Sequence, residues 1–131
     1  MVGVRRLLLV AFVLFAVPGC LITVDDDDDE GLFVDWTITG DFDPLLCDVF
    51  GAFDVEIAVV DLFSNRVDTF YEPCDSFGIS LAALPGSYDV ELTMLDRRGD
   101  PISDTLIDRN VDVFEDEETY VPFDFLSSDF L

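Results

Sequence analysis

The sequence contains no histidine and no lysine, and its only basic residues are six arginines. Without histidine, the chain cannot form a Ser–His or Cys–His nucleophile pair and lacks the nitrogen ligand common in zinc sites. It also has no glycine-rich phosphate-binding loop. Paired carboxylates could support glycoside hydrolysis, but close pairs arise by chance in so acidic a chain. We therefore expect that the protein is not an enzyme, with a carboxylate-only hydrolase as a remote alternative.

Positive charge is scarce. The 131 residues include 29 acidic residues and six arginines, which gives a net charge of −23. Such a field repels nucleic acid, so we expect no nucleic-acid partner. It favours cations and basic proteins, which leaves a cationic partner or another envelope protein as candidates. Abundant aspartate without lysine also resembles the surface chemistry of salt-adapted proteins.

Long hydrophobic runs are limited to one, at residues 7–17, which follows Arg5 and Arg6. A membrane-spanning helix needs about 20 apolar residues, and this run has eleven. Its length and the preceding arginines are typical of the apolar middle of a secretory signal. We expect residues 1–19 to be a signal peptide with a helical core. The paired arginines also resemble those of twin-arginine export signals.

The run ends in Val17-Pro18-Gly19-Cys20, which resembles the lipobox of bacterial lipoproteins. In that family an aliphatic residue stands three positions before the cysteine and a small residue directly before it. The resemblance implies cleavage before Cys20, acylation of its thiol and new amino terminus, and stable anchoring by several acyl chains. In some bacterial lipoproteins an aspartate after the lipidated cysteine favours retention in the inner membrane. This chain has Leu21 at that position, so the resemblance implies a lipid-anchored envelope protein of the outer membrane. The alternative is an ordinary cleaved signal that contains a cysteine.

Residues 20–31 then form a lipidated cysteine and an acidic linker, with five aspartates and a glutamate at 25–30. A block of like charges repels itself and stays extended, so we expect a disordered tether. The eleven residues after Cys20 would reach at most roughly 36 Å. A metal or partner site is the alternative interpretation of this run.

Apolar and polar residues alternate through much of residues 32–131, with the period of two that is typical of half-buried strands. The clearest alternating apolar sets are Val34, Trp36 and Ile38; Phe53, Val55, Ile57 and Val59; Tyr88, Val90, Leu92 and Met94; and Val121, Phe123 and Phe125. Weaker strands are expected at residues 66–71, 77–81, 102–107 and 110–114.

Turn signals at Ser64-Asn65, Pro85-Gly86, residues 98–101 and residues 115–118 separate these segments, and no helical period of useful length is present. The pattern predicts an all-β domain over 32–131: a single antiparallel two-sheet sandwich, immunoglobulin-like or prealbumin-like, of about seven strands. Pro122 cannot donate a backbone hydrogen bond, so the last strand is expected at a sheet edge.

The segment Leu84-Pro85-Gly86-Ser87-Tyr88-Asp89-Val90 resembles a turn-into-strand motif of prealbumin-like and fibronectin-type sandwiches. These include the carboxypeptidase regulatory-like domains. The resemblance implies that the tyrosine packs across the corner before its strand. It bears on the fold class alone, because fold does not determine function.

With Cys20 assigned to acylation, Cys47 and Cys74 remain of the three cysteines. An exported protein meets an oxidising compartment, so we expect a disulfide between them, joining the loop before the second strand to the loop after the third. A metal pair is disfavoured because the chain offers no further soft ligand.

Binding sites are less clearly indicated. We expect no cofactor. Calcium is the alternative, with Asp41, Asp43 and Asp48 as weak candidate ligands, although their spacing does not match the Asp-x-Asp-x-Asp-Gly loop. Eleven of the thirteen phenylalanines lie beyond the signal. Those outside the predicted inward faces either fold over the ends of the sandwich or form a binding patch: Phe33, Phe42, Phe50, Phe63 and Phe130. We expect a structural or binding envelope protein, or alternatively a calcium-, carbohydrate- or protein-binding module.

The charge generates a first prediction. Removal of residues 1–19 leaves four arginines and 29 acidic residues, hence a formal charge of −25. Self-repulsion destabilises a compact domain at low salt, and salt screens it. The melting temperature of the purified domain should therefore rise between low and molar salt. A melting temperature that stays level across this series would contradict salt adaptation.

Overall fold

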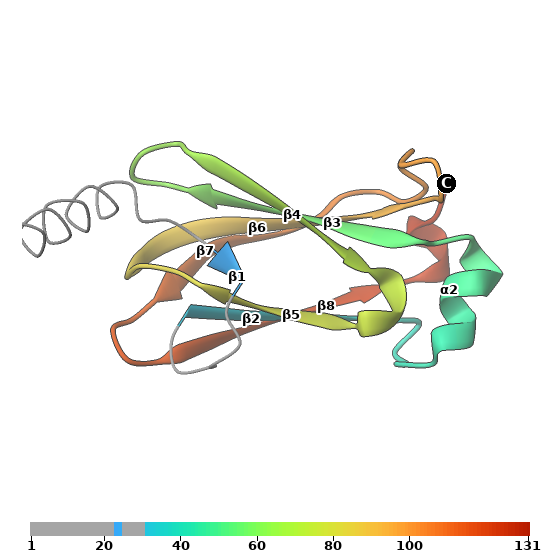
Figure 1. The fold of residues 1–131 in the computed structure, drawn as a ribbon, viewed down its shortest axis with the longest axis horizontal. Coiled ribbons are helices and arrows are strands. Elements are labelled where there is room, and N and C mark those ends of the chain that lie inside the picture. Colours follow the sequence, from blue (N-terminus) through green and yellow to red (C-terminus); the bar gives the residue numbers. More distant parts are fainter. Residues whose placement is uncertain (1–22, 25–30) are drawn as a thin grey trace, which may run out of the picture.

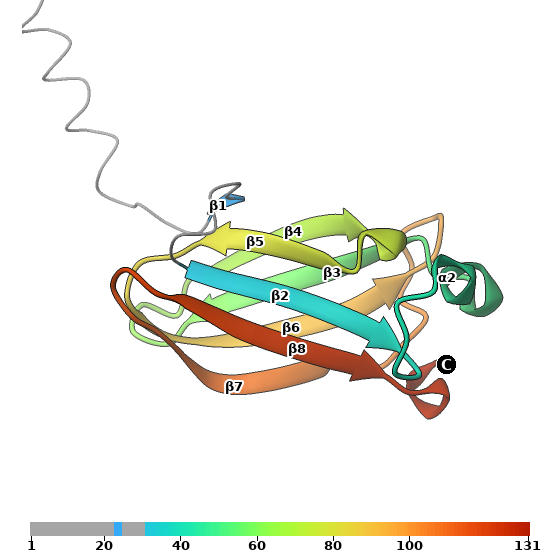
Figure 2. The same ribbon diagram turned by 90° about the horizontal axis from the view of Figure 1, so that it is seen from below.

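The protein is a sandwich of two β-sheets packed face to face (Figures 1 and 2). The computed structural model describes residues 23–24 and 31–131. The first sheet has the order β1-β5-β2-β8, with β1 at Thr23–Val24, β5 at Gly78–Ala82, β2 at Gly31–Ile38 and β8 at Glu118–Phe125. The second has the order β4-β3-β6-β7, with β4 at Val67–Pro73, β3 at Asp54–Asp61, β6 at Gly86–Leu95 and β7 at Leu106–Val113. The predicted all-β sandwich is confirmed.

The core lies between the sheets and is filled by the inward side chains of the central strands. The four predicted alternating segments form β2, β3, β6 and β8. Their apolar residues are buried, with two exceptions: Phe123 is partly buried, and Phe53 precedes β3 with 45% of its surface exposed. The alternating pattern predicts that Phe53 faces inward with Val55, Ile57 and Val59, and this prediction is wrong. The two weak segments at 102–107 and 110–114 are replaced by the single strand β7.

One strand pair is parallel, which corrects the prediction of a purely antiparallel sandwich. β8 runs parallel to β2 from Gly31 opposite Glu118 to Ile38 opposite Phe125. The parallel direction arises because the chain passes from β7 in one sheet to β8 in the other and enters β8 beside the start of β2 (Figure 2). β8 is an edge strand, as the proline at position 122 predicted.

Short helices occupy connections that were predicted to be loops: α2 at Pro44–Phe50, and the 3-10 helices η1 at Cys74–Ser76 and η2 at Ser127–Asp129. At the start of α2, the Asp43 carboxylate accepts a hydrogen bond from the Leu45 amide at 3.0 Å, and Pro44 suits the first turn. Gly51 ends the helix with a left-handed φ of 76°. Seven residues are too few to show a helical period in the sequence.

The first sheet includes residues that the sequence assigned to the linker. Thr23 and Val24 pair with Ala82 and Leu81 of β5. Gly31 is buried at the start of β2 with a φ of 115°, where a Cβ would clash with the Leu81 carbonyl oxygen. The predicted signal at 1–19, the lipidation site Cys20 and the acidic run at 25–30 lie outside the described residues. Within the described part, no helix is long and apolar enough to cross a membrane.

A disulfide joins Cys47 in α2 to Cys74 in η1, as predicted. The helix α2 connects β2 to β3, and η1 connects β4 to β5, so both bridged segments carry the chain between the sheets. The Trp36 indole Nε1–H donates a hydrogen bond to the Cys74 carbonyl at 2.9 Å. The disulfide therefore fastens two crossovers at one end of the sandwich, which we call the disulfide end.

Loss of this bond should lower the stability of the domain. The two cysteines are separated by 27 positions, and closing a loop of that length stabilises a fold by about 3.5 kcal/mol in the chain-entropy model. The variant C47S/C74S should lose a free energy of unfolding of that order in urea titrations, whereas C20S should unfold like the wild type. Equal stability of C47S/C74S and the wild type would contradict this role.

Candidate functional site

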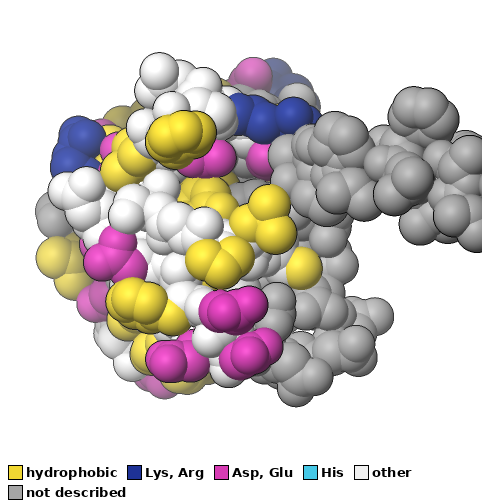
Figure 3. All heavy atoms as spheres, turned by 90° about the vertical axis from the view of Figure 1, so that its left-hand side faces the viewer, with side chains coloured by type: hydrophobic (Ala, Val, Ile, Leu, Met, Phe, Trp, Pro, Cys, Tyr) yellow, Lys and Arg dark blue, Asp and Glu magenta, His cyan; other side chains and the backbone are white. Residues whose placement is uncertain are grey.

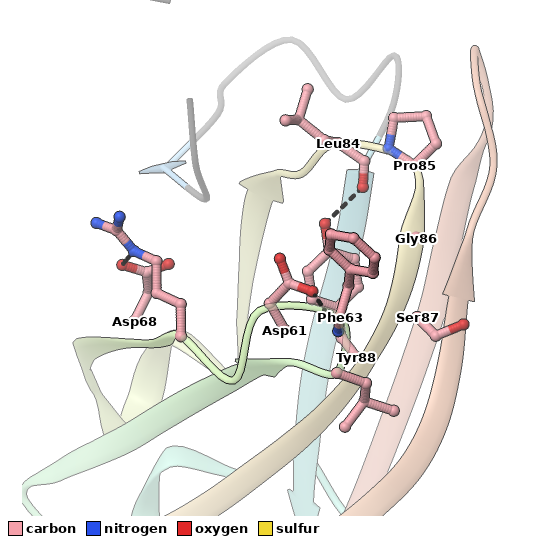
Figure 4. A pocket seen from close by; sticks show the side chains of 10 residues that line it. Asp61, Phe63, Asp68, Leu84, Pro85, Gly86, Ser87 and Tyr88 are labelled. Carbon is pink, nitrogen blue, oxygen red and sulfur yellow. Dashed lines mark hydrogen bonds and ion pairs between the residues drawn. The ribbon is translucent and has the colours of Figure 1, made fainter. Parts of the chain in front are cut away.

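The candidate site lies opposite the disulfide, at the end that carries β1, the β3–β4 turn (62–66), the β5–β6 turn (83–85) and the β7–β8 connection (114–117). We call it the β1 end. A cavity of about 610 Å³ opens there between the β3–β4 and β5–β6 turns (Figure 4). Its walls come from strand ends of the second sheet and from the turn that leads into β6.

The β3–β4 turn is fixed by hydrogen bonds from its own residues. The Asp61 carboxylate accepts from the Phe63 amide at 2.9 Å, and the Asp61 carbonyl accepts from the Asn65 amide at 2.7 Å. Asn65 has a left-handed φ of 62°, a conformation that asparagine tolerates well. The turn directs the Phe63 side chain into solvent, where 96% of its surface is exposed.

The opposite wall is held by Tyr88. Its hydroxyl donates a hydrogen bond to the Leu84 carbonyl at 2.6 Å, and 4% of the residue is exposed. Burial raises the pKa of Tyr88 above its ordinary value, and the negative charges of Asp61 and Asp68 act in the same direction. The tyrosine thus spans the corner between the sheets and leaves the Leu84 side chain half exposed.

The cavity lining combines apolar surface with a few charged groups. Asp61 and Asp68 supply carboxylates, and Arg66 supplies a guanidinium whose Nε lies 3.4 Å from Asp68 Oδ1. The Ser87 hydroxyl donates a hydrogen bond to Asp112 at 2.6 Å. This arrangement suits contact with a ligand that has an apolar part and a positively charged or hydrogen-bonding part.

Exposed apolar side chains lie at the β1 end (Figure 3), and others lie at the disulfide end, where Leu45 and Val49 of α2 are 66% and 71% exposed. Phe63 is joined by Leu84 at 53% exposure and by Phe114, on the β7–β8 connection, at 57%. Phe63 is one of the phenylalanines expected outside the inward faces. The other four have aromatic neighbours: Phe33 stacks with Tyr120, Phe42 meets Phe77 edge-on, and Phe50 stacks with Phe130.

The three candidate calcium ligands lie beside α2, at the disulfide end. Asp43 caps the helix, Asp41 forms an isolated bridge with Ile38, and Asp48 lies within the helix. In residues 23–24 and 31–131, no three or more acidic, cysteine or histidine residues form a group that could hold a metal ion. The structure therefore does not bring Asp41, Asp43 and Asp48 together as a site.

Another acidic pair, Asp96 and Asp100, belongs to a loop at the disulfide end. The Asp96 carboxylate accepts hydrogen bonds from the backbone amides of Asp100 and Arg98, each at 2.9 Å. These bonds, chiefly that from Asp100, lower the pKa of Asp96, and the charge of Arg98 contributes in the same direction. The carboxylate is thus used to shape the loop.

Sequence reasoning did not find the cavity, although it found both turns beside it. Ser64-Asn65 and Pro85-Gly86 were identified as separate turn signals. Their proximity follows from the pairing of Asp61 with Tyr88 across β3 and β6, which places the two turns at the same end of one sheet. A predicted strand register would have been needed to bring them together.

Comparison of the chain with protein-family models, with curated proteins and with solved structures finds no match. Its function is therefore argued from its own residues.

The hydrogen bond from the Tyr88 hydroxyl leads to a prediction about stability. Y88F removes a hydroxyl that donates to the Leu84 carbonyl, and loss of one such hydrogen bond costs about 1 kcal/mol. Y71F is the matched control, because the Tyr71 hydroxyl donates to the Glu56 carboxylate at the exposed surface and should matter by less than about 0.5 kcal/mol. Urea unfolding at neutral pH measures both. Equal losses in the two variants would contradict the corner role of Tyr88.

Proposed function

We propose that the protein is a lipid-anchored envelope lipoprotein whose β-sandwich has a structural or binding role outside the lipid. The observation that carries the proposal is the disulfide between Cys47 and Cys74. It occupies two of the three cysteines, so Cys20 is the third and its thiol is free of the disulfide. Cys20 also directly follows the segment that resembles an export signal and a lipobox.

The surface charge supports a cation or a basic protein as the binding partner. Ion pairs of Arg66, Arg98 and Arg109 with aspartates occur at 3.4 to 3.8 Å, all with partly or largely exposed side chains. Such exposed pairs offset little of the repulsion within the chain. Most of the 29 carboxylates therefore contribute to a negative field that attracts cationic surfaces.

A second candidate is a binding module for calcium, a carbohydrate or a protein. The cavity between the β3–β4 and β5–β6 turns favours it, because carboxylates and an exposed phenylalanine meet there. A melting temperature that rises with calcium but not with magnesium at equal ionic strength would support an ion-dependent module over a purely structural role.

The lipid anchor is tested by expressing the full chain and its C20A variant in a bacterium that processes lipoproteins. The wild type should enter the membrane fraction, and mass spectrometry should find an acylated amino-terminal peptide that begins at Cys20. C20A should lack both the acyl mass and the cleavage before position 20.

The variant C47S/C74S is the matched control for the loss of cysteine. It should keep the acyl mass and the membrane location, because acylation requires Cys20 alone. A wild-type chain that is cleaved elsewhere, or that retains a free Cys20 thiol, would overturn the proposal.

A further inference from the structure

We propose that the β1 end of the sandwich lies against the lipid surface in which Cys20 is anchored, with Phe63 and Leu84 in contact with the lipid. This inference rests on the proposed function and deepens it by assigning an orientation to the anchored domain. It identifies the partner of the exposed apolar side chains as a membrane surface of low charge.

The first argument is the length of chain between the anchor and the fold. Thr23 pairs with Ala82, the last residue of β5, so the chain joins the sandwich at the β1 end (Figure 1). Three residue steps separate Cys20 from Thr23, and they span at most about 11 Å when fully extended. An acylated Cys20 therefore holds this end close to the lipid.

The same length keeps the opposite end away from the membrane. The ten residues of β6 run between the two ends, and a strand of that length spans about 33 Å. An 11 Å connection cannot bring the disulfide end to the lipid unless the domain lies on its side. The acidic run at 25–30 follows Thr23 in the chain, so it adds nothing to this connection.

The second argument is what the β1 end presents. Phe63 is 96% exposed, and Leu84, across the cavity from it, is 53% exposed. Phe114 extends the apolar surface from the β7–β8 connection. The Asp61 carboxylate and the backbone of the turn hold Phe63 outward, so its exposure is built into the turn. Phenylalanine and leucine side chains of this kind bind at the boundary of headgroups and acyl chains.

The charges at this end define the kind of lipid. Asp61 and Asp68 flank the cavity, where Arg66 pairs with Asp68, and residues 115–117 are all acidic. Carboxylates are repelled by anionic headgroups. The contact is therefore with zwitterionic lipid, and it weakens as the anionic fraction of the membrane rises at low salt.

Tryptophan fluorescence in lipid vesicles tests the orientation. The lipidated full-length F63W variant is placed in phosphatidylcholine vesicles with and without brominated acyl chains, which quench tryptophan on contact. F53W is the matched control, because Phe53 is also partly exposed but lies at the disulfide end, beneath the Arg97 guanidinium. Trp36 is fully buried in the wild type, whose emission is subtracted from that of each variant.

The inference predicts that the emission of Trp at position 63 shifts to shorter wavelength and is mostly quenched, whereas that at position 53 is unchanged. Replacing part of the lipid by phosphatidylglycerol at low salt should reduce the quenching at position 63. Circular dichroism and the mass of the disulfide-linked peptide confirm that both variants are folded.

The same samples separate this inference from the proposed function. If the chain is acylated at Cys20 and position 63 is quenched no more than position 53, the orientation is overturned while the lipid anchor stands. If Cys20 carries no acyl group, the proposed function fails and the orientation fails with it.

Discussion

The disulfide between Cys47 and Cys74 is the constraint on which the rest of the structure depends. It joins the two helical segments through which the chain passes between the sheets, α2 on the way to β3 and η1 on the way to β5. Trp36, at the centre of the core, donates its hydrogen bond to the same segment. A chain with 29 acidic residues repels itself, and this covalent link holds the two crossovers together against that repulsion.

The two ends of the sandwich are consequently different. The disulfide end is closed by a covalent bond and by the stacked rings of Phe50 and Phe130. The β1 end is closed by hydrogen bonds, chiefly that of Tyr88, and it carries the cavity and the exposed Phe63. The chain also enters the fold at the β1 end. Attachment to lipid through Cys20 would cover the exposed side chains of Phe63 and Leu84 at the β1 end.

Local alternation predicted β2, β3, β6 and β8 because each buries one side chain in two against the other sheet. It missed α2, which is too short for a helical period. It also predicted two weak strands where the chain forms the single strand β7, whose middle residues are exposed. The parallel pairing of β2 with β8 and the meeting of residues 61 and 88 depend on contacts between distant segments, which no local pattern encodes. The disulfide was predictable because Cys20 had a separate assignment, which left one pair.

The central claim is that the domain meets the membrane with the β1 end and leaves the disulfide end in water. Hydrogen exchange followed by mass spectrometry tests it most directly, on the acylated chain in phosphatidylcholine vesicles and on C20A without lipid. The account predicts slower exchange on the membrane for residues 62–66 and 83–86, and equal exchange for residues 43–53. Slower exchange at 43–53, or no difference at either end, would contradict it.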